Sequence, residues 1–336
     1  MNRSLLLSHQ VAQACGAALE EIFAAAPRRL DLLPYAPGVS YTPQQIAGIE
    51  VAFYSRNLWE GTPGKHASPE AQAFWAVADA APRLQWLQIL SVGLDHKAYQ
   101  PSLRRGVRIT TAAGTNAEPV ALNALAGLLM LARGFLHTLR AQQQALWQPF
   151  PPAQVPHDLA GKTAVIIGTG DIGTRIARGL QALGVQTLGL RRQARPAEGF
   201  DEVLGGEALD RLLPRADWLL LACPLTEQTR GLIDARRLAL LPPGAGLVNV
   251  ARGEIVVEAA LIEALRQGRL LGAYLDVFAQ EPLPPESPLW TLPNVILTPH
   301  SASASSGTHG RGVALFLRNL RAYLHGEPMT GEVGRA

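Results

Sequence analysis

The chain has 336 residues, of which 48% are hydrophobic and 17% charged, a balance typical of a folded protein long enough for two domains. Its formal net charge is +3 and its basic residues are scattered, which disfavours a nucleic-acid-binding surface. The two cysteines, Cys15 and Cys223, are far apart, and no apolar run is long enough for a signal peptide or a membrane span. We therefore expect a cytoplasmic protein without disulfides, a metal site or a membrane partner.

The first third of the chain alternates short apolar runs with helical patterns. Helices are expected over residues 11–26 and 69–80, and Ser68 is a good N-cap for the second because Pro69 follows it. Strands alternating with helices predict a parallel sheet covered on both faces. The expected strands are residues 5–7, 30–33, 51–54, 84–90 and 107–111.

A long helix over residues 118–146 and a proline-rich surface loop over residues 147–157 precede a second run of the same pattern. Residues 163–167 are almost continuously apolar, as in a strand buried on both faces. A last helix is expected over residues 303–324, and the pattern alone assigns it to neither sheet. The further expected strands are residues 163–167, 186–190, 218–222, 246–249, 272–275 and 295–297.

A glycine-rich turn follows the strand at residues 163–167. It has the spacing G-x-G-x-x-G, and a helix is expected over residues 174–183. In such a turn the first glycine allows a tight bend, the second lets the backbone approach a pyrophosphate, and the third lets the helix pack on the strand. The helix N-terminus adds N–H donors for phosphate, so the turn predicts dinucleotide binding. The candidate cofactor-binding residues here are Gly168, Gly170, Asp171, Ile172 and Gly173.

Two arginines, Arg191 and Arg192, follow the next strand. An acidic residue at this place would accept hydrogen bonds from the ribose 2′-hydroxyl of NAD, whereas arginines suit the 2′-phosphate of NADP. We expect NADP. NAD remains the alternative if the two arginines are only solvated loop residues.

Three later stretches, together with the glycine turn, resemble the D-isomer-specific 2-hydroxyacid dehydrogenases, and among them the glyoxylate and hydroxypyruvate reductases. The stretches are residues 249–253 (NVARG), 276–283 (DVFAQEPL) and 293–300 (PNVILTPH). The resemblance implies an α/β fold of two doubly wound parallel-sheet domains and a homodimer formed largely through the cofactor domains. A Rossmann cofactor domain, residues 117–302, is inserted into a flavodoxin-like substrate domain made of residues 1–116 and 303–336.

The same stretches carry a candidate catalytic set, Arg252, Glu281 and His300. A 2-keto acid presents a carboxylate beside a polarised carbonyl, and the guanidinium fork of Arg252 can hold both. When hydride reaches the carbonyl carbon, His300 can protonate the developing alkoxide, because imidazole titrates near neutrality. Glu281 can stabilise the imidazolium. Taken singly, each residue also suits a structural role, but together and in the family's order they favour catalysis.

The resemblance assigns further residues to the cofactor and the substrate. Val250 and Ala251 are expected beside the nicotinamide, and Asp276 is expected to orient its carboxamide. A loop beneath the cofactor would contain Cys223, Pro224 and Thr226, with Cys223 as a packing residue rather than a nucleophile.

A first-domain loop, residues 91–96, resembles the substrate loop of the family. The backbone N–H groups of Val92 and Gly93 would bind the substrate carboxylate, and His96 is expected to be structural. Arg56 and Asn57 follow a strand and could face the cleft, but a direct substrate contact from them is not favoured.

The leading prediction is an NADPH-preferring reductase of a small 2-keto acid such as glyoxylate or hydroxypyruvate. One alternative is an NAD-dependent dehydrogenase of a larger D-2-hydroxy acid such as phosphoglycerate. A second is a cofactor-sensing interaction protein on the same fold, which the intact catalytic set disfavours. Formate dehydrogenases pair the histidine with glutamine, so Glu281 argues against that chemistry.

Overall fold

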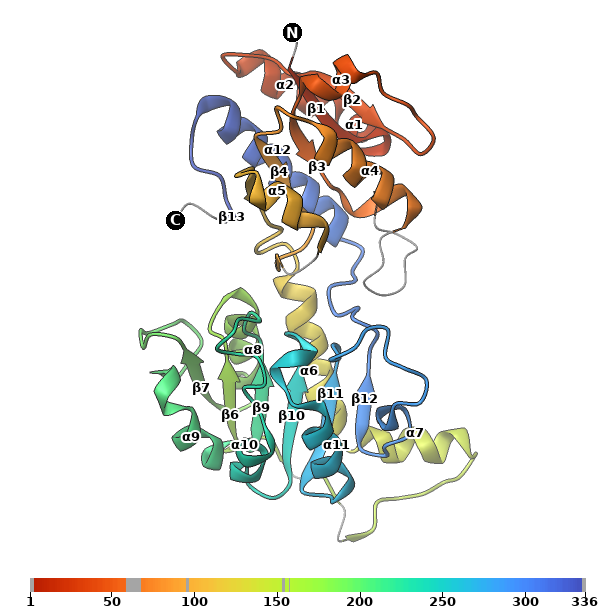
Figure 1. The fold of residues 1–336 in the computed structure, drawn as a ribbon. Helices are drawn as coiled ribbons and strands as arrows, with labels where there is room; N and C mark the ends of the chain where they lie inside the picture. Colours follow the sequence, from red (N-terminus) through yellow and green to blue (C-terminus); the bar gives the residue numbers. More distant parts are fainter. Residues whose placement is uncertain (1–2, 59–67, 95–96, 153–154, 157, 334–336) are drawn as a thin grey trace. The chain divides into compact units, whose positions relative to one another are not determined.

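The computed structural model describes residues 3–58, 68–94, 97–152, 155–156 and 158–333. The chain divides into two compact units (Figure 1). Unit 1 consists of Met1–Asn116 and Ser305–Ala336, and unit 2 of Ala117–Ala304. Each unit has its own sheet and its own hydrophobic clusters, and each is described by itself.

The sheet of unit 1 has six strands in the order β13-β5-β4-β3-β1-β2. Neighbours among β1 to β5 pair in parallel, and β13 is antiparallel to β5. The order 2-1-3-4-5 is that of flavodoxin-like sheets. The strands are β1 (Ser4–Ser8), β2 (Asp31–Tyr35), β3 (Ile49–Phe53), β4 (Trp86–Gln88), β5 (Arg108–Thr110) and β13 (Glu332–Val333).

Both faces of this sheet are covered. Successive side chains of a strand point to opposite faces, and Leu5 and Leu7 of β1 belong to one hydrophobic cluster whereas Leu6 belongs to another. Helix α4 has the predicted bounds, and the Ser68 side chain caps it by accepting the N–H of Ala71. The helices and short turns are α1 (His9–Ala14), α2 (Gly16–Ala25), α3 (Pro43–Gly48), η1 (Arg56–Leu58), α4 (Pro69–Ala80), η2 (Lys97–Tyr99), α5 (Gln100–Arg104) and α12 (Thr308–His325).

Two helix predictions for unit 1 need correction. The helix expected over residues 11–26 is split into α1 and α2, because Cys15 leaves helical dihedrals (φ −110°, ψ 11°) and Gly16, a weak helix former, follows it. The last helix, α12, begins at Thr308 rather than at residue 303, and it packs in unit 1 through Phe316 and Leu320.

The sheet of unit 2 has seven parallel strands in the order β12-β11-β10-β9-β6-β7-β8. Counted from β6 as the first strand, this order contains the 3-2-1-4-5-6 arrangement of dinucleotide-binding sheets. Strand β8 was not expected, since it is a short edge strand with partly exposed residues. The strands are β6 (Thr163–Ile167), β7 (Gln186–Arg191), β8 (Glu202–Gly205), β9 (Trp218–Leu221), β10 (Ala245–Asn249), β11 (Leu270–Leu275) and β12 (Val295–Leu297).

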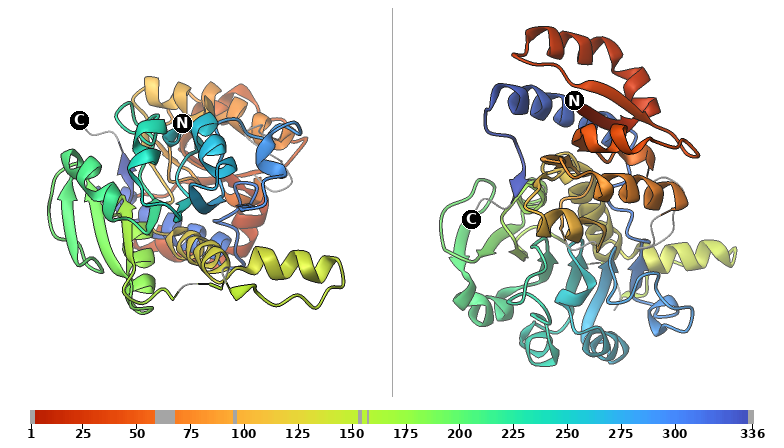
Figure 2. Two further views of the ribbon diagram at one scale, coloured as in Figure 1. Left: turned by 90° about the horizontal axis from the view of Figure 1, so that it is seen from below. Right: turned by 45° about the horizontal axis from the view of Figure 1, so that its top comes forward.

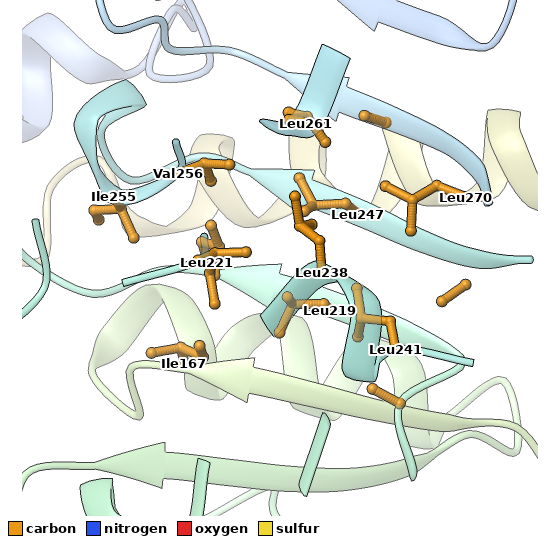
Figure 3. Packing of buried hydrophobic residues seen from close by; sticks show 14 of the residues in the cluster. Ile167, Leu219, Leu221, Leu238, Leu241, Leu247, Ile255, Val256, Leu261 and Leu270 are labelled. Atoms are coloured by element: carbon orange, nitrogen blue, oxygen red, sulfur yellow. The ribbon is translucent and has the colours of Figure 1, made fainter. Parts of the chain in front are cut away.

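The core on one face of this sheet lies between β6, β9 and β10 and the helices α10 (Ala235–Leu240) and α11 (Glu258–Arg266) (Figure 3). Ile167, Leu221 and Leu247 point into it from the strands, and Leu238 and Leu261 from the helices. Complete burial of such a side chain stabilises a fold by roughly 1.5–3 kcal/mol. This packing fixes the positions of the carboxyl ends of β6, β9 and β10 relative to one another.

Helices α6 (Ala117–Ala132) and α8 (Asp171–Gln181) pack on the other face. The prediction of a single helix over residues 118–146 is wrong. The chain turns at Gly134, whose φ is +67°, and α7 (Phe135–Gln143) continues at 75° to α6. A side chain at Gly134 would also collide with Phe150. Figures 1 and 2 show α7 extending away from the sheet of unit 2.

Within the described residues, no single helix is long and apolar enough to cross a membrane; only the bent pair of α6 and α7, taken together, has the necessary length and composition. Helix α6 itself is largely buried against α8, β10 and β11.

Candidate active site

The residues singled out in unit 2 follow the ends of its strands. Gly168 comes directly after β6, Arg191 ends β7, and Arg252, Asp276 and His300 follow β10, β11 and β12. Because the carboxyl ends of parallel strands meet at one edge of a sheet, these residues lie along the same edge. The order of the strands therefore gathers side chains that are up to 132 residues apart in the sequence.

The glycine turn leaves no room for side chains at two of its three glycines. Gly168 has a φ of +106°, and a Cβ there would lie 2.5 Å from the carbonyl oxygen of Ala222. A Cβ at Gly173 would lie 1.9 Å from the carbonyl oxygen of Gly168, so the absent side chain lets α8 approach the turn.

Gly170, the N-cap of α8, has open space around it. Asp171 and Ile172 form the first turn of this helix, which begins three residues earlier than expected. The hydroxyl of Thr169 is buried without a partner among the described residues. An open glycine, an unsatisfied hydroxyl and a helix N-terminus together fit the pyrophosphate of a dinucleotide.

Two arginines lie at and just after the end of β7, the strand that follows α8. Arg191 is half-buried at the end of β7 and Arg192 is exposed. Neither guanidinium has a hydrogen-bond or ion-pair partner in the part of the chain that the structure describes. Both are therefore available to an anionic ligand.

The loop after β9 is held by its own hydrogen bonds. The N–H of Thr226 donates to Oγ1 of Thr229 (2.7 Å), whose hydroxyl donates to the carbonyl of Pro224 (2.8 Å). Cys223 is buried in the core, and burial raises the pKa of its thiol to about 11. The thiol is thus protonated near neutral pH, which suits packing rather than nucleophilic attack.

Asn249 shapes the loop that carries Arg252. Its Oδ1 accepts the N–H of Ala251 (3.0 Å), and its Nδ2 donates to the carbonyl of Arg252 (3.0 Å). Arg252 Nη1 donates to the carbonyl of Ala251 (2.7 Å), and Val250 and Ala251 are buried. A Cβ at Gly253 would lie 1.9 Å from the carbonyl carbon of Phe278, so this glycine lets the loops after β10 and β11 touch.

His300 and Glu281 form the predicted pair. His300 Nδ1 lies 2.8 Å from Oε2 of Glu281, whose other oxygen accepts the N–H of Phe278 (3.0 Å). A carboxylate can only accept, so Nδ1 carries the hydrogen of this bond. The Glu281 side chain is 6% exposed and that of His300 46% exposed. His300 Nε2 has no partner among the described residues and is open to a ligand.

Asp276 holds the backbone on both sides of His300. Its carboxylate accepts the hydroxyl of Thr298 (2.6 Å) and the N–H groups of Ser301 (2.8 Å) and Ala302 (3.0 Å). Its carbonyl accepts the N–H of His300 (2.8 Å). Burial raises the pKa of this carboxyl, and the hydrogen bonds from Thr298, Ser301 and Ala302 offset the rise only in part.

These contacts keep His300 in a left-handed conformation, with φ at +48°. A non-glycine residue there costs on the order of 1–3 kcal/mol and persists only when its surroundings determine it. The positioning roles of Asp276, Thr298 and Asn249 were not foreseen from the sequence. The only available signal was that all three lie within the motifs that carry Arg252, Glu281 and His300.

The expected substrate residues Val92 and Gly93 lie in unit 1, in the loop after β4. The hydroxyl of Ser91 is 2.9 Å from the carbonyl oxygen of Gly93 and 2.9 Å from the hydroxyl of Tyr99, which fixes the loop, and Val92 is exposed. His96, expected to be structural, lies outside the described residues.

Comparisons with known proteins bear on this geometry. Residues 125–302 match the family described as D-isomer specific 2-hydroxyacid dehydrogenase, NAD binding domain. A glyoxylate reductase of Korarchaeum cryptofilum is 37% identical over 258 residues, which cover 75% of this chain and 76% of the relative.

Two solved structures extend the likeness over the whole chain. A D-isomer specific 2-hydroxyacid dehydrogenase family protein of Aeromonas salmonicida aligns with a TM-score of 0.78 and 32% identity, covering 99% of both chains. An NADPH-dependent glyoxylate/hydroxypyruvate reductase of Sinorhizobium meliloti, in complex with NADP and sulfate, aligns with a TM-score of 0.76 and 27% identity, covering 99% of this chain and 98% of that one.

Together with the strand order and the glycine turn, these matches define the class of protein as a nicotinamide-dependent oxidoreductase. The chain belongs to the D-isomer specific 2-hydroxyacid dehydrogenase family. The resemblance drawn from its sequence and the predicted fold class are confirmed.

Proposed function

We propose that this enzyme reduces a small 2-keto acid, glyoxylate or hydroxypyruvate, to the D-2-hydroxy acid with NADPH. The observation that carries the proposal is the pairing of His300 with Glu281, 2.8 Å apart on the sheet edge that also bears the glycine turn. Unit 2 is the dinucleotide-binding domain in this proposal, and unit 1 supplies the substrate loop with Val92 and Gly93.

In the reductive direction, the bound nicotinamide supplies the hydride for the carbonyl carbon. Arg252 holds the carboxylate and carbonyl oxygen of the substrate, and His300 delivers a proton from Nε2 to the developing alkoxide. Glu281 keeps the hydrogen on Nδ1 and stabilises the imidazolium before transfer. The Asp276 carboxylate also keeps the loop of His300 in place, by accepting the backbone N–H groups of Ser301 and Ala302.

The cofactor would lie along the edge of the sheet. Gly168, Gly170 and Gly173 and the first turn of α8 would hold its pyrophosphate. Val250 and Ala251 would border the nicotinamide, with Asp276 orienting its carboxamide. The loop with Cys223, Pro224 and Thr226 would lie beneath the cofactor.

Two observations support NADPH over NADH. Arg191 and Arg192 lie at the end of β7, the strand after which dinucleotide-binding sheets contact the ribose, and within the described residues no carboxylate neutralises them. The Sinorhizobium meliloti relative is described as NADPH-dependent, in complex with NADP. For the substrate, the support is that the Korarchaeum cryptofilum relative is a glyoxylate reductase.

We expect a homodimer. Apolar residues are exposed on α7 and just after it, among them Phe135, Leu146 and Trp147, which is 97% exposed. An apolar surface on a segment that extends from its unit suits contact with a second copy of the chain. Light scattering after gel filtration would distinguish a dimer from a monomer.

The decisive test is oxidation of NADPH and NADH across a panel of 2-keto acids with one to three carbons beyond the carboxylate. We expect turnover of glyoxylate and hydroxypyruvate and a lower KM for NADPH. Replacing both Arg191→Ser and Arg192→Ser should raise the KM for NADPH at least tenfold, because the loss of even one charged hydrogen bond costs roughly 1.5–3 kcal/mol. The KM for NADH should not rise.

Arg266→Ser, an exposed arginine at the end of α11, is the matched control and should behave as wild type. Turnover only of larger acids with NADH would favour a phosphoglycerate-type dehydrogenase. Tight cofactor binding without turnover of any 2-keto acid would point to a cofactor-sensing protein and contradict the proposal.

A further inference from the structure

A small pocket in unit 1 carries two basic side chains that the proposed mechanism does not use. It lies at the carboxyl ends of β3, β4 and β5 and beside the first turn of α12. Ligands of α/β sheets bind at the carboxyl ends of the strands, so the place is that of a ligand site. Its polar lining consists of Ser55, Arg56, Gln88, Thr115, Asn116, Thr308 and His309.

The two basic residues are Arg56, in η1, and His309, in the first turn of α12. Both are half-buried, and neither has a hydrogen-bond or ion-pair partner among the described residues. No described residue lining the pocket is acidic. A half-buried guanidinium without a counter-charge loses hydration without compensation, and an anion would restore the balance.

The neutral polar side chains of the lining are already engaged in the fold. The Gln88 amide Nε2 donates to the carbonyl of Thr111 (3.2 Å), and its Oε1 accepts the amide of Asn319 in α12 (2.9 Å). The hydroxyl of Thr115 donates to the carbonyl of Ala112 (2.7 Å). The groups left for a ligand are therefore hydrogen-bond donors: the two cationic side chains and the amide N–H₂ of Asn116, whose Oδ1 accepts the hydroxyl of Thr115 (3.3 Å).

The walls of the pocket are also held together across the chain. Nε of Arg311 donates to the carbonyl of Thr115 (2.7 Å), which joins the start of α12 to the segment after β5. The Ser55 hydroxyl donates to Oδ1 of Asn57 (2.7 Å), and that oxygen also accepts the hydroxyl of Ser8 (3.1 Å). Arg56 thus sits on a turn that is fixed before any ligand arrives.

The size of the pocket limits what enters it. Its volume of about 20 Å³ is little more than one water-sized sphere needs. It therefore admits at most the terminal oxygens of a ligand, such as those of one carboxylate or of one edge of a phosphate, and not a whole cofactor. The planar fork of Arg56 suits two oxygens of such a group.

We propose that this pocket binds the oxyanion end of a small molecule, a carboxylate or a phosphate, with Arg56 as its main contact and His309 as its second. The oxyanion has two sources: a carboxylate or phosphate of the 2-keto acid itself, which rests on the proposed function, or a separate small anion. Either source gives Arg56 a ligand contact that the sequence did not favour.

Calorimetric titration of the full chain with inorganic phosphate tests the pocket directly. Arg56→Met keeps the apolar stem and removes the guanidinium, and it should weaken one phosphate site at least tenfold. Arg83→Met, at an exposed arginine of the same unit outside the pocket, is the matched control and should titrate as wild type. Any other phosphate site on the chain is shared by wild type, Arg56→Met and Arg83→Met, so it does not affect the comparison.

His309→Gln should weaken the same site about threefold, and it provides an independent result if circular dichroism shows that Arg56→Met is not folded. Identical phosphate binding by wild type and by the folded variants would overturn the proposal.

Steady-state kinetics then separate the two sources. The KM of Arg56→Met is measured for glyoxylate and for oxaloacetate, a 2-keto acid with a second carboxylate. A rise of tenfold or more for either acid, with no such rise in Arg83→Met, identifies the substrate as the source. Loss of the phosphate site with both KM values unchanged identifies a separate anion. If wild type turns over no 2-keto acid, the proposed function fails while the calorimetric result still stands.

Discussion

His300 is placed by two independent devices in the structure. Glu281 holds its ring through Nδ1, and Asp276 holds its backbone through the flanking residues Ser301 and Ala302. The ring nitrogen that remains open, Nε2, is the one that can reach a substrate. Holding a group at both ring and backbone is the kind of preorganisation that proton transfer requires.

Replacing His300→Ala removes the proposed proton donor without touching the glycine turn. The kcat for glyoxylate reduction should fall about 10²- to 10⁴-fold, the usual contribution of a positioned acid. The affinity for NADPH, followed by its fluorescence, should stay as in wild type. His325→Ala, at an exposed histidine in the last turn of α12, serves as the control. Reduction by His300→Ala at the wild-type rate would show that another group supplies the proton.

Arg252, Glu281 and His300 were recognisable from the sequence because each lies in a short motif with a chemical purpose. The hydrogen-bond role of Asp276 was not recognisable, because it depends on contacts with residues 22 to 26 positions further along the chain. That Arg56 has no partner among the described residues could not be predicted either, since a sequence does not show which charged groups find a counter-ion.

The glycines of the turn that leads into α8 have different roles. At Gly173 the fold itself leaves no space for a Cβ, whereas at Gly170 the space is open. Gly170 has φ −80° and ψ −168°, a backbone conformation that alanine adopts without strain. A glycine is therefore required at position 173 by the fold, and we expect one to be required at position 170 by the cofactor.

Gly173→Ala should lower the free energy of unfolding by roughly 2–3 kcal/mol, because its Cβ would collide with the Gly168 carbonyl. Gly170→Ala should leave the thermal midpoint unchanged and weaken NADPH at least tenfold, because its Cβ would occupy the space expected for the pyrophosphate. Thermal unfolding and fluorescence titration measure the two effects. Equal affinity for NADPH in Gly170→Ala and wild type would show that the pyrophosphate does not bind at this turn.

Among the helices and strands, those with strong local signals were predicted best. The bounds of α4, β6 and β12 agree with the expected ranges, because a cap or a continuous apolar run marks their ends. The edge strands β8 and β13 were not predicted, since β8 is short with partly exposed residues and β13 is a two-residue strand whose partner, β5, lies far away in the sequence. The break between α6 and α7 depends on Phe150, which leaves no room for a side chain at Gly134.

Unit 1 joins the two ends of the chain around one buried carboxylate. Glu50 in β3 is 2% exposed and bonds to Arg3 (2.7 Å), to Arg28 (2.6 Å) and to Tyr323 in α12 (2.7 Å). Burial alone would raise the pKa of Glu50, but the hydrogen bonds from Arg28 and Tyr323 and the charges of Arg28 and Arg3 outweigh it and lower the pKa. The ionised form is therefore bound more tightly in the folded state.

Because the folded-state pKa of Glu50 is lowered, its contribution to stability is present above the ordinary glutamate pKa and is lost as the pH falls through the lowered value. Glu50→Gln should reduce the free energy of unfolding at pH 7 by roughly 2–3 kcal/mol, and the difference from wild type should shrink below about pH 4. Denaturant unfolding at several pH values measures it.

Glu20→Gln is the matched control for this experiment, because Glu20 also pairs with an arginine, Arg29, but both side chains are more than half exposed. It should have no measurable effect at any pH. A difference between Glu50→Gln and wild type that stays constant down to pH 3 would exclude the carboxylate charge as its cause.

The sequence by itself determined the parts of this protein that are local: the alternation of strands and helices, the glycine turn, and the motifs that carry Arg252, Glu281 and His300. These follow from spacing and side-chain chemistry within a few residues. The tertiary structure alone decided that α12 packs in unit 1, that Asp276 holds the loop of His300, and that Arg56 and His309 share a pocket. Each of these depends on which strands become neighbours, and that is settled by long-range packing rather than by any short stretch of sequence. The histidine and its carboxylate partner were visible from the start, but the residues that hold them in place became visible only once the chain was folded.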